Sequence, residues 1–264
     1  MAIEVQKEDG VHVITINRPE RRNALDLPHF GALADAWIDF RDDDDARVAI
    51  ITGTGKDFSV GADLKSFVPM VTDNIDELAS GKSEIRADAG LVAVLREFEL
   101  WKPVIAAVNG TCVAGGMELL LGTDIRIASE NATFGIAEPK RGLFPGGGTT
   151  VRLPRQIPFP WAMEILLTAE FVDAETAYRM GIVNAVVSQD DLLDTAKDFA
   201  RRIMANAPLA IEAVKRSVLS TLRMPLKEAF EFELMEAAKV FMTEDAKEGP
   251  RAFAEKRPPV WQRR

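Results

Sequence analysis

The chain has 264 residues, of which 47% are hydrophobic, and it carries a formal net charge of −9 at pH 7. This length and composition predict a protein with a sizeable core, built as one large α/β domain or two modest ones. The acidic balance excludes a global field that would favour nucleic acid or an anionic membrane, so an anionic ligand needs local basic residues.

Residue types that support metal or nucleophile chemistry are scarce. The single cysteine, Cys112, excludes an internal disulfide, and His12 and His29 leave no cluster at metal-ligand spacing. We expect Cys112 to be a small core residue, and no G-x-S-x-G motif supports a serine triad. The N-terminal segment has acids where a signal peptide would be basic and then apolar, and polar residues interrupt the apolar run 104–122. A cytoplasmic location is therefore expected.

The N-terminal third predicts a hairpin, a helix and a strand. Residues 3–6 and 11–17 alternate apolar and polar side chains around a Glu-Asp-Gly turn, which is typical of a hairpin. Asp26 is expected to cap a helix with Pro28 in its first turn, because apolar residues follow at helical spacing. An acidic loop then leads into an apolar run that ends at Gly53, as buried parallel strands do.

The same plan recurs along the chain. We predict a helix over 83–100, a strand over 104–108, a loop and helix, and a third round with a strand over 124–128. Residues 66–82 lack a steady period and are expected to form a mobile loop over a site. From about residue 190 the pattern is helical only, which predicts a helical layer on the same fold. The helix over 226–242 carries an apolar stripe, which is either core or a subunit interface.

One acid stands out in the apolar segment NGTCVAGGMELLLG, residues 109–122. Glu118 has Met117 and Leu119 beside it and few polar directions around it. An ionised carboxylate in such surroundings is costly unless it is paired, so its pKa tends to be raised. Glu118 is either a solvated acid at a helix N-terminus or a catalytic group.

Two further loops combine glycine with acids: GTGKDFSVGADLK (53–65) and TFGIAEPKRGLFPGGGTT (133–150). Neither fits a dinucleotide fingerprint or a P-loop. Gly61 and the pair Gly115-Gly116 are either plain turns or positions where a ligand approaches the backbone. In the second case the N–H groups of Ala62 and Gly115 are free to donate, and two such donors make an oxyanion hole.

Five segments in order, ITINRPERRNAL, FSVGADLK, KPVIAAVNGTCVAGGMEL, FGIAEPKRGLFPGGGT and EGPRAFAEKR, resemble the crotonase, or enoyl-CoA hydratase/isomerase, superfamily. The resemblance covers essentially the whole chain. It implies an α/β fold, a ClpP-like spiral of ββα units over residues 1–190 that carries the acyl-CoA site. It also implies a helical trimerisation region over 191–264 that completes the CoA site, in a homotrimer or a hexamer.

The resemblance also assigns roles to individual residues. It makes Ala62 and Gly115 the two oxyanion-hole donors, and Glu118 and Glu138 the catalytic pair. If the loop 133–150 is instead aligned on its proline, Lys140 occupies the position of Glu138. The alanine at position 114 stands where the family usually has glycine.

A set of residues is expected to hold the CoA and acyl parts of the substrate. From the resemblance, the set for CoA and substrate consists of Arg22, Ala24, Ala62, Asp63, Leu64, Lys65 and Gly115, with Phe253 and Lys256 contributed by a neighbouring subunit. We interpret Asp63 and Asp124 as structural acids that pair with backbone or arginine. Phe67, Phe144 and Trp161 are candidates for the acyl pocket, although core positions are the stronger expectation for them.

The predicted activity is the reversible hydration of a trans-2-enoyl-CoA, because both glutamates of the family's hydratases are present. It needs no metal and no cofactor other than the coenzyme A of the substrate. The alternatives are a Δ3,Δ2-enoyl-CoA isomerase, another acyl-CoA lyase or hydrolase, or a weakly catalytic CoA- or RNA-binding relative. The low pI argues against RNA, so the expected partners are the acyl-CoA and further copies of the chain, with no nucleic acid and no membrane.

Overall fold

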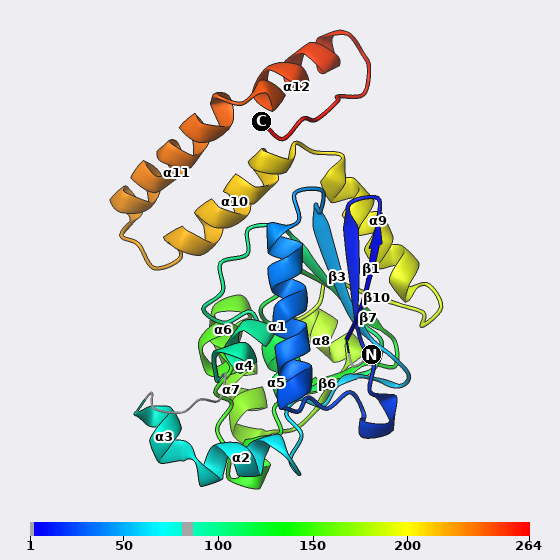
Figure 1. Cartoon of the computed structure of the whole chain (residues 1–264), viewed down its shortest axis with the longest axis vertical. Coiled ribbons are helices and arrows are strands. Elements are labelled where there is room, and N and C mark those ends of the chain that lie inside the picture. The colour runs from blue at the N-terminus through cyan, green and yellow to red at the C-terminus, as the bar shows by residue number, and fades with distance from the viewer. Residues whose placement is uncertain (1–2, 81–86) are drawn as a thin grey trace.

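The main sheet runs through the body of the molecule in a computed structural model that describes residues 3–80 and 87–264 (Figure 1). Its six strands lie in the order β1-β2-β3-β5-β7-β10. Their bounds are β1 Ile3–Glu8, β2 Val11–Ile16, β3 Val48–Gly53, β5 Val104–Val108, β7 Ile125–Ser129 and β10 Ala185–Val187. β1 and β2 form the predicted antiparallel hairpin, and all other neighbours in this sheet are parallel. The predicted strands at 48–53, 104–108 and 124–128 are confirmed, the last with a shift of one residue.

A smaller sheet lies beside the first and receives the chain after β3, β5 and β7. Its order is β4-β6-β8-β9, with bounds β4 Asp57–Ser59, β6 Thr111–Val113, β8 Thr133–Gly135 and β9 Val172–Asp173. The chain thus passes from β3 to β4, from β5 to β6 and from β7 to β8. This repeated step between two sheets is the predicted spiral, and it brings the loops after β4, β6 and β8 to one region.

Both faces of the main sheet are covered, which explains why its strands are almost wholly apolar. Side chains alternate between the faces along each strand. On one side Ile14 and Ile51 join the large core beneath helix α1 (Leu27–Asp42). On the other side Val13 and Ile50 pack against helix α9 (Leu192–Met204).

Helix α1 begins as predicted. The Asp26 side chain accepts a hydrogen bond from the backbone N–H of His29 at 3.1 Å, and Pro28 occupies the first turn. A proline there costs no hydrogen bond, because the first N–H groups of a helix have no partner within it.

The predicted helix over 83–100 is too long. Residues 83–86 lie outside the described part of the chain, and helix α4 covers only Ala87–Ala93. Leu95 adopts a left-handed conformation with φ 56°, and the N–H groups of Leu95 and Arg96 donate to the carbonyls of Val92 and Leu91. This is a Schellman ending, formed without the usual glycine.

The predicted loop over 66–82 is wrong in its secondary structure. Residues 81–82 lie outside the described range, but the rest forms helix α2 (Phe67–Asp73) and helix α3 (Ile75–Ala79). Apolar residues at positions 67, 70, 71 and 75 do have helical spacing, interrupted by Pro69 and Asn74. Both helices lie at one end of the molecule (Figure 1).

The remaining described elements complete the body and form an arm at the opposite end from α2 and α3 (Figure 1). In the body are η1 Pro19–Arg21, α5 Gly115–Leu120, η2 Pro139–Arg141, α6 Thr149–Gln156, α7 Phe159–Thr168 and α8 Ala174–Met180. The arm consists of α10 Pro208–Thr221, α11 Leu226–Phe241 and α12 Glu244–Ala254. The division after residue 190 stays a prediction, since α9 packs on the sheet whereas α10 to α12 extend away from it.

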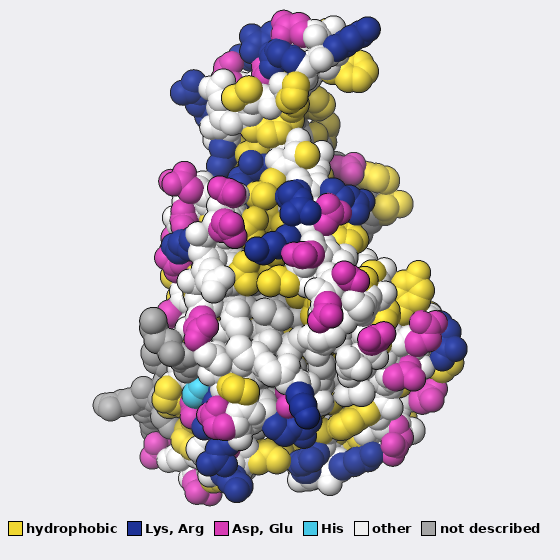
Figure 2. Space-filling view, turned by 90° about the vertical axis from the view of Figure 1, so that its right-hand side faces the viewer, with side chains coloured by type: hydrophobic (Ala, Val, Ile, Leu, Met, Phe, Trp, Pro, Cys, Tyr) yellow, Lys and Arg dark blue, Asp and Glu magenta, His cyan; other side chains and the backbone are white. Residues whose placement is uncertain are grey.

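The apolar stripe predicted on the helix over 226–242 is not core within this chain. On α11, Leu226, Phe230, Leu234 and Phe241 are all more than half exposed. Apolar side chains gather over this narrow end of the molecule in the face that Figure 2 presents. Among the described residues, no helix combines the length and hydrophobicity that crossing a bilayer requires.

Candidate active site

A cavity of about 790 Å³ opens where the loops after β4, β6 and β8 meet helices α1, α2 and α4. Its wall is largely apolar, with Phe30, Phe67 and Leu91 from these three helices. Phe67 packs on Phe30 with ring centroids 4.7 Å apart. Both Glu118 and Glu138 line this cavity, so residues 20 positions apart in sequence lie in one apolar chamber.

Glu118 is held in the first turn of α5 and is only 8% exposed. Helix α5 lies so close to β4 that a side chain at Gly116 would collide with the carbonyl of Ser59. The Oε1 atom of Glu118 accepts a hydrogen bond from the backbone N–H of Gly147. Burial, and next the charge of Glu138, raise the pKa of Glu118 to about 7, while the Gly147 N–H opposes the rise.

Glu138 comes directly after β8 and precedes the short turn η2. Within the described part of the chain its Oε2 atom is buried and has no hydrogen-bond partner. Burial raises the pKa of Glu138, and hydrogen bonds from nearby backbone and the charge of Arg141 oppose the rise. A carboxyl group with an unpaired buried oxygen is costlier to ionise than an exposed one, so this site favours the protonated form more than water does.

Lys140, the alternative to Glu138, has a different environment. Its Nζ atom lies 2.7 Å from Oε1 of Glu170, and both side chains are about half exposed or more. Lys140 does not line the cavity, whereas Glu138 does.

The backbones of Gly61-Ala62 and Ala114-Gly115 approach each other at the cavity wall. A Cβ on Gly61 would collide with the N atom of Gly115, and one on Gly115 would lie 3.4 Å from the N atom of Ala62. The neighbouring N–H groups of Leu25 and Asp63 are used in a bridge between two loops. Across the described residues, the N–H groups of Ala62 and Gly115 have no acceptor in the chain.

Ala114 stores backbone strain next to these amides. It has φ 54° and ψ −128°, a conformation that glycine adopts freely and alanine does not. The conformation turns the chain from β6 into α5, and it sets the direction of the Gly115 N–H.

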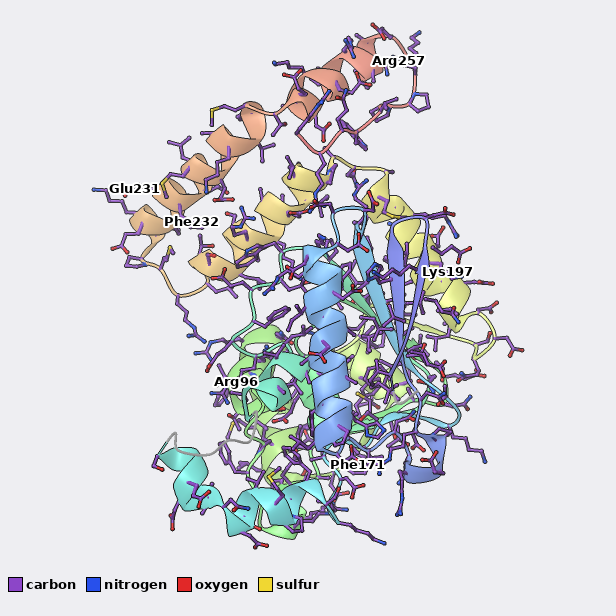
Figure 3. All side chains as sticks on the ribbon, viewed as in Figure 1. Arg96, Phe171, Lys197, Glu231, Phe232 and Arg257 are labelled. Carbon is purple, nitrogen blue, oxygen red and sulfur yellow. The ribbon has the colours of Figure 1, made fainter. Side chains whose placement is uncertain are left out.

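The residues predicted for CoA divide into two groups. Arg22, Ala24, Leu64 and Lys65 line the cavity, and Arg21 joins them. Phe253 and Lys256 do not line it in this chain, because α12 lies at the far end of the molecule, as the label on Arg257 also shows in Figure 3.

The two acids interpreted as structural are paired, which confirms that interpretation. Asp63 accepts a hydrogen bond from Nη1 of Arg18 at 3.0 Å and one from the N–H of Lys65 at 2.9 Å. Asp124 accepts from the backbone N–H of Val104 at 2.8 Å, as expected, and also from Nζ of Lys215 at 2.7 Å.

The three aromatic candidates for the acyl pocket lie in different environments. Phe67 is half-buried and lines the cavity. The expectation of core positions is wrong for Phe144, which lines the cavity but is 75% exposed, and for Trp161, which is 43% exposed and outside it. Phe144 lies between η2 and α6 and Trp161 lies in the first turn of α7, and their hydrophobicity alone does not reveal that these positions are exposed. Cys112 is buried as expected, and burial raises the pKa of its thiol.

Three residues around Glu118 were not identified from the sequence. Gly147 lies so close that a Cβ would collide with the Glu118 carboxylate, and Arg152 and Arg96 act on the charge of that carboxylate. The run of three glycines at 146–148 is the one signal that could have indicated a close backbone approach.

In the described residues no group of three or more His, Cys, Asp or Glu side chains could hold a metal ion. The site offers one buried and one partly buried carboxyl group, two unpaired amides and a basic rim.

Comparison with known proteins identifies relatives along the whole chain. The profile of the family described as enoyl-CoA hydratase/isomerase matches residues 6–264. The chain is 43% identical over 261 residues to enoyl-CoA hydratase EchA19 of Mycobacterium tuberculosis, which covers 98% of this chain and 96% of that protein. It is also 43% identical over 268 residues to carnitinyl-CoA dehydratase of Salmonella enteritidis, covering 100% and 99% of the two chains.

Solved structures agree with this assignment. The enoyl-CoA hydratase of Bacillus anthracis superposes with a TM-score of 0.92 at 32% identity and covers 100% of both chains. Enoyl-CoA hydratase EchA1 of Mycobacterium marinum has a TM-score of 0.89 at 39% identity, covering 100% of this chain and 99% of its own. The chain therefore belongs to the enoyl-CoA hydratase/isomerase family and has the crotonase fold.

Proposed function

We propose that this enzyme reversibly hydrates a trans-2-enoyl-CoA to the 3-hydroxyacyl-CoA. The observation that carries the proposal is the pair of carboxyl groups, of the buried Glu118 and the partly buried Glu138, in one cavity beside two unpaired backbone amides. Hydration requires a base for water, an acid for Cα, and stabilisation of the charge that collects on the thioester oxygen.

The surroundings of the two carboxyl groups support different roles. Glu118 accepts the N–H of Gly147 and faces the guanidinium groups of Arg152 and Arg96, all of which favour its ionised form. We assign to Glu118 the removal of a proton from water as its oxygen bonds to Cβ. Glu138, with its unpaired Oε2, delivers a proton to Cα. Transfer of a proton from Glu118 to Glu138 then restores the starting state.

The N–H groups of Ala62 and Gly115 would bind the thioester oxygen. The positions of these two N–H groups are fixed before substrate binds, because Gly61 and Gly115 have no side chain and let the two loop segments come into contact. Removing one such donor typically costs roughly 10²- to 10³-fold in rate. Arg22 and Lys65 at the rim would bind the phosphate groups of CoA, and the apolar wall would hold the acyl chain.

A second candidate is the same chemistry on an acyl group that carries a quaternary ammonium. The 43% identity to a carnitinyl-CoA dehydratase over the whole chain favours it. The two candidates share the cavity and the carboxyl pair and differ only in the acyl group accepted.

Assembly as a homotrimer or hexamer is part of the proposal. The exposed apolar residues of α11 support it, because exposed patches of this kind commonly mark interfaces. A neighbouring copy would then bring Phe253, which is 87% exposed, and Lys256 to the CoA site. The cytoplasmic location stays a prediction.

The test is a spectrophotometric assay in which crotonyl-CoA and longer enoyl-CoAs lose the absorbance of the conjugated thioester. Mass spectrometry of the product checks for the addition of one water. Crotonobetainyl-CoA in the same assay tests the second candidate. Conversion of a 3-enoyl-CoA without net hydration of any 2-enoyl-CoA would show an isomerase and overturn the proposal.

A further inference from the structure

The side chain of Arg152 on α6 enters the interior of the body next to Glu118. Its Nη1 atom donates to the backbone carbonyls of Val94 at 2.9 Å and Glu118 at 3.2 Å, and its Nη2 atom donates to the carbonyl of Leu95. Burial lowers the pKa of Arg152, and the charge of Glu118 opposes this change. In the described part of the chain no carboxylate lies within ion-pair distance of it, so Glu118 is the acid that compensates its charge.

The fold makes room for this guanidinium. A Cβ on Gly122 would lie 2.9 Å from Nη1 of Arg152, inside normal contact distance. Gly148 adopts φ +125° just before α6, and a Cβ on it would lie 3.6 Å from the Arg152 side chain. The left-handed Leu95 turns the end of α4 so that two carbonyls point at Arg152. One side chain thus joins the end of α4 to the backbone of the proposed catalytic base.

A second guanidinium acts on the same carboxylate from the other side of the loop. Nη1 of Arg96 donates to the carbonyl of Gly146, whose neighbour Gly147 donates its N–H to Glu118. Arg96 is 40% exposed and follows α4, on the side of the body shown by its label in Figure 3. The charged groups that face Glu118 are therefore Glu138, Arg152 and Arg96, while Arg141 acts on Glu138.

We propose that Arg152, with Arg96 in support, is a positioning residue that fixes the backbone of Glu118 and keeps its carboxylate ionised within an apolar cavity. The inference rests on the proposed function, in which Glu118 must be ionised to accept a proton from water. A positive charge near a carboxylate favours its ionised form, and the effect is larger where water is excluded. Without Arg152, burial and the repulsion from Glu138 would raise the pKa of Glu118 further.

The test is the pH dependence of kcat/KM for enoyl-CoA hydration in wild type, Arg152→Met and Arg152→Lys. In Arg152→Met the acid limb of the kcat/KM profile moves to higher pH by about half a unit or more. This shift lowers kcat/KM at pH 6 by roughly threefold more than at pH 9. Arg152→Lys keeps the charge, so its acid limb stays at the wild-type position even if turnover falls at every pH.

Arg126 offers a matched control. It is 7% exposed, burial lowers its pKa to about 10, and it donates to the carbonyls of Leu121 and Thr123 at the other end of α5. It is not among the main causes of the shifted pKa of Glu118. Arg126→Met is expected to lower stability and leave the acid limb unmoved.

The outcomes separate the inference from the proposed function. An unmoved acid limb in Arg152→Met, or a shift in Arg152→Lys or Arg126→Met as large as that in Arg152→Met, would overturn the inference and show a purely structural role. If Arg152→Met does not fold, Arg96→Met tests the same point, with a smaller shift in the same direction expected. If wild type hydrates no enoyl-CoA, the proposed function fails. A carbon-13 NMR titration of the Glu118 carboxyl in Arg96→Met and Arg152→Lys then still decides whether these charges hold its ionised form.

Discussion

Two buried acids in different parts of this molecule have pKa values that are shifted in opposite directions. Glu118 in the cavity is 8% exposed and Glu248 in the C-terminal arm is 4% exposed. The pKa of Glu118 is raised to about 7, whereas hydrogen bonds from Arg257, the N–H of Val260 and Arg251 hold the pKa of Glu248 well below its usual range. Both side chains are covered, but burial is the largest cause of the raised pKa of Glu118, whereas hydrogen bonds from cations and a backbone N–H outweigh burial at Glu248.

The whole arm repeats this contrast. Its buried acids are Glu236, Asp245 and Glu248, and each accepts hydrogen bonds from cations or backbone N–H groups, while its apolar side chains are exposed. In the body the apolar side chains are buried, and the carboxylate of Glu118 accepts one hydrogen bond, from a backbone N–H. A buried acid in direct ion-pair contact with cations serves structure, and one whose cations act only from beyond ion-pair distance is ready for proton transfer.

The largest effect expected from this contrast is on turnover. Glu118→Gln and Glu138→Gln should each lower hydration by roughly 10²-fold or more, because each removes one partner of general acid–base catalysis. Steady-state assays with crotonyl-CoA measure this directly. The exposed Glu130→Gln serves as a control and should retain wild-type turnover.

Lys140→Met tests the alternative assignment in the same assay. Since Lys140 pairs with Glu170 outside the cavity, its loss should leave hydration within a few-fold of wild type. A collapse of activity in Lys140→Met with normal activity in Glu138→Gln would reverse the assignment of the acid.

The next effect is on the stability of the fold, which the substitution of a buried acid is expected to raise rather than lower at high pH. The pKa of Glu118 is higher in the fold than its ordinary value of 4.5, so its contribution is complete below about pH 4.5 and is lost as the pH rises through 7. A rise from 4.5 to about 7 corresponds to about 3 kcal/mol. Urea unfolding should therefore find Glu118→Gln more stable than wild type at pH 8, by up to that amount, but not at pH 4.5. Equal urea unfolding curves for wild type and Glu118→Gln at pH 8 would show that ionisation of Glu118 does not lower the stability of the fold.

A smaller effect is expected from the contact between Gly147 and Glu118. A methyl group at position 147 would displace the Glu118 carboxylate, so Gly147→Ala should lower kcat about tenfold or more. Gly146→Ala is the matched control, because the nearest atom to its added Cβ, the carbonyl oxygen of Phe144, is 4.0 Å away. Equal losses in the two variants would mean that loop flexibility, not the position of Glu118, is affected.

The smallest effect should come from the arm. Glu236 accepts hydrogen bonds from Arg216 at 2.9 Å and from Lys239, and these lower its pKa although burial opposes the change. Its contribution to stability is present above about pH 4.5 and is lost as the pH falls through its lowered pKa. Glu236→Gln should cost about 1 kcal/mol at pH 7, since the partners are partly exposed. A gain in stability at pH 7, as expected for Glu118→Gln, would remove the contrast between the two regions.

Much of the site could be predicted from the sequence because its parts are local. Ala62, Gly115, Glu118 and Glu138 each lie within a short motif, and the repeated strand-loop plan brings these motifs to one cavity. Helix α1 was predictable for the same reason, since its cap and its apolar spacing are contiguous.

What could not be predicted depends on contacts between distant segments. Arg152 reaches the ends of α4 and α5, and nothing in its own segment indicates this. Helix α4 ends early where Leu95 turns left-handed, against the preference of its own side chain, and the Leu95 carbonyl accepts a hydrogen bond from the distant Arg152. Whether the stripe on α11 is covered within the chain depends on where the arm points, which helical spacing does not specify.

The most direct test of the account is a carbon-13 NMR titration of the glutamate carboxyl groups, with Glu118 assigned by the signal that is missing in Glu118→Gln. The account predicts a midpoint near 7 for Glu118, together with an acid limb of hydration at the same pH. It also predicts that Glu248 stays ionised well below pH 4.5 in the same spectra. A midpoint for Glu118 at its ordinary value of 4.5 would contradict the claim that a buried acid outside direct ion-pair contact is the reacting group.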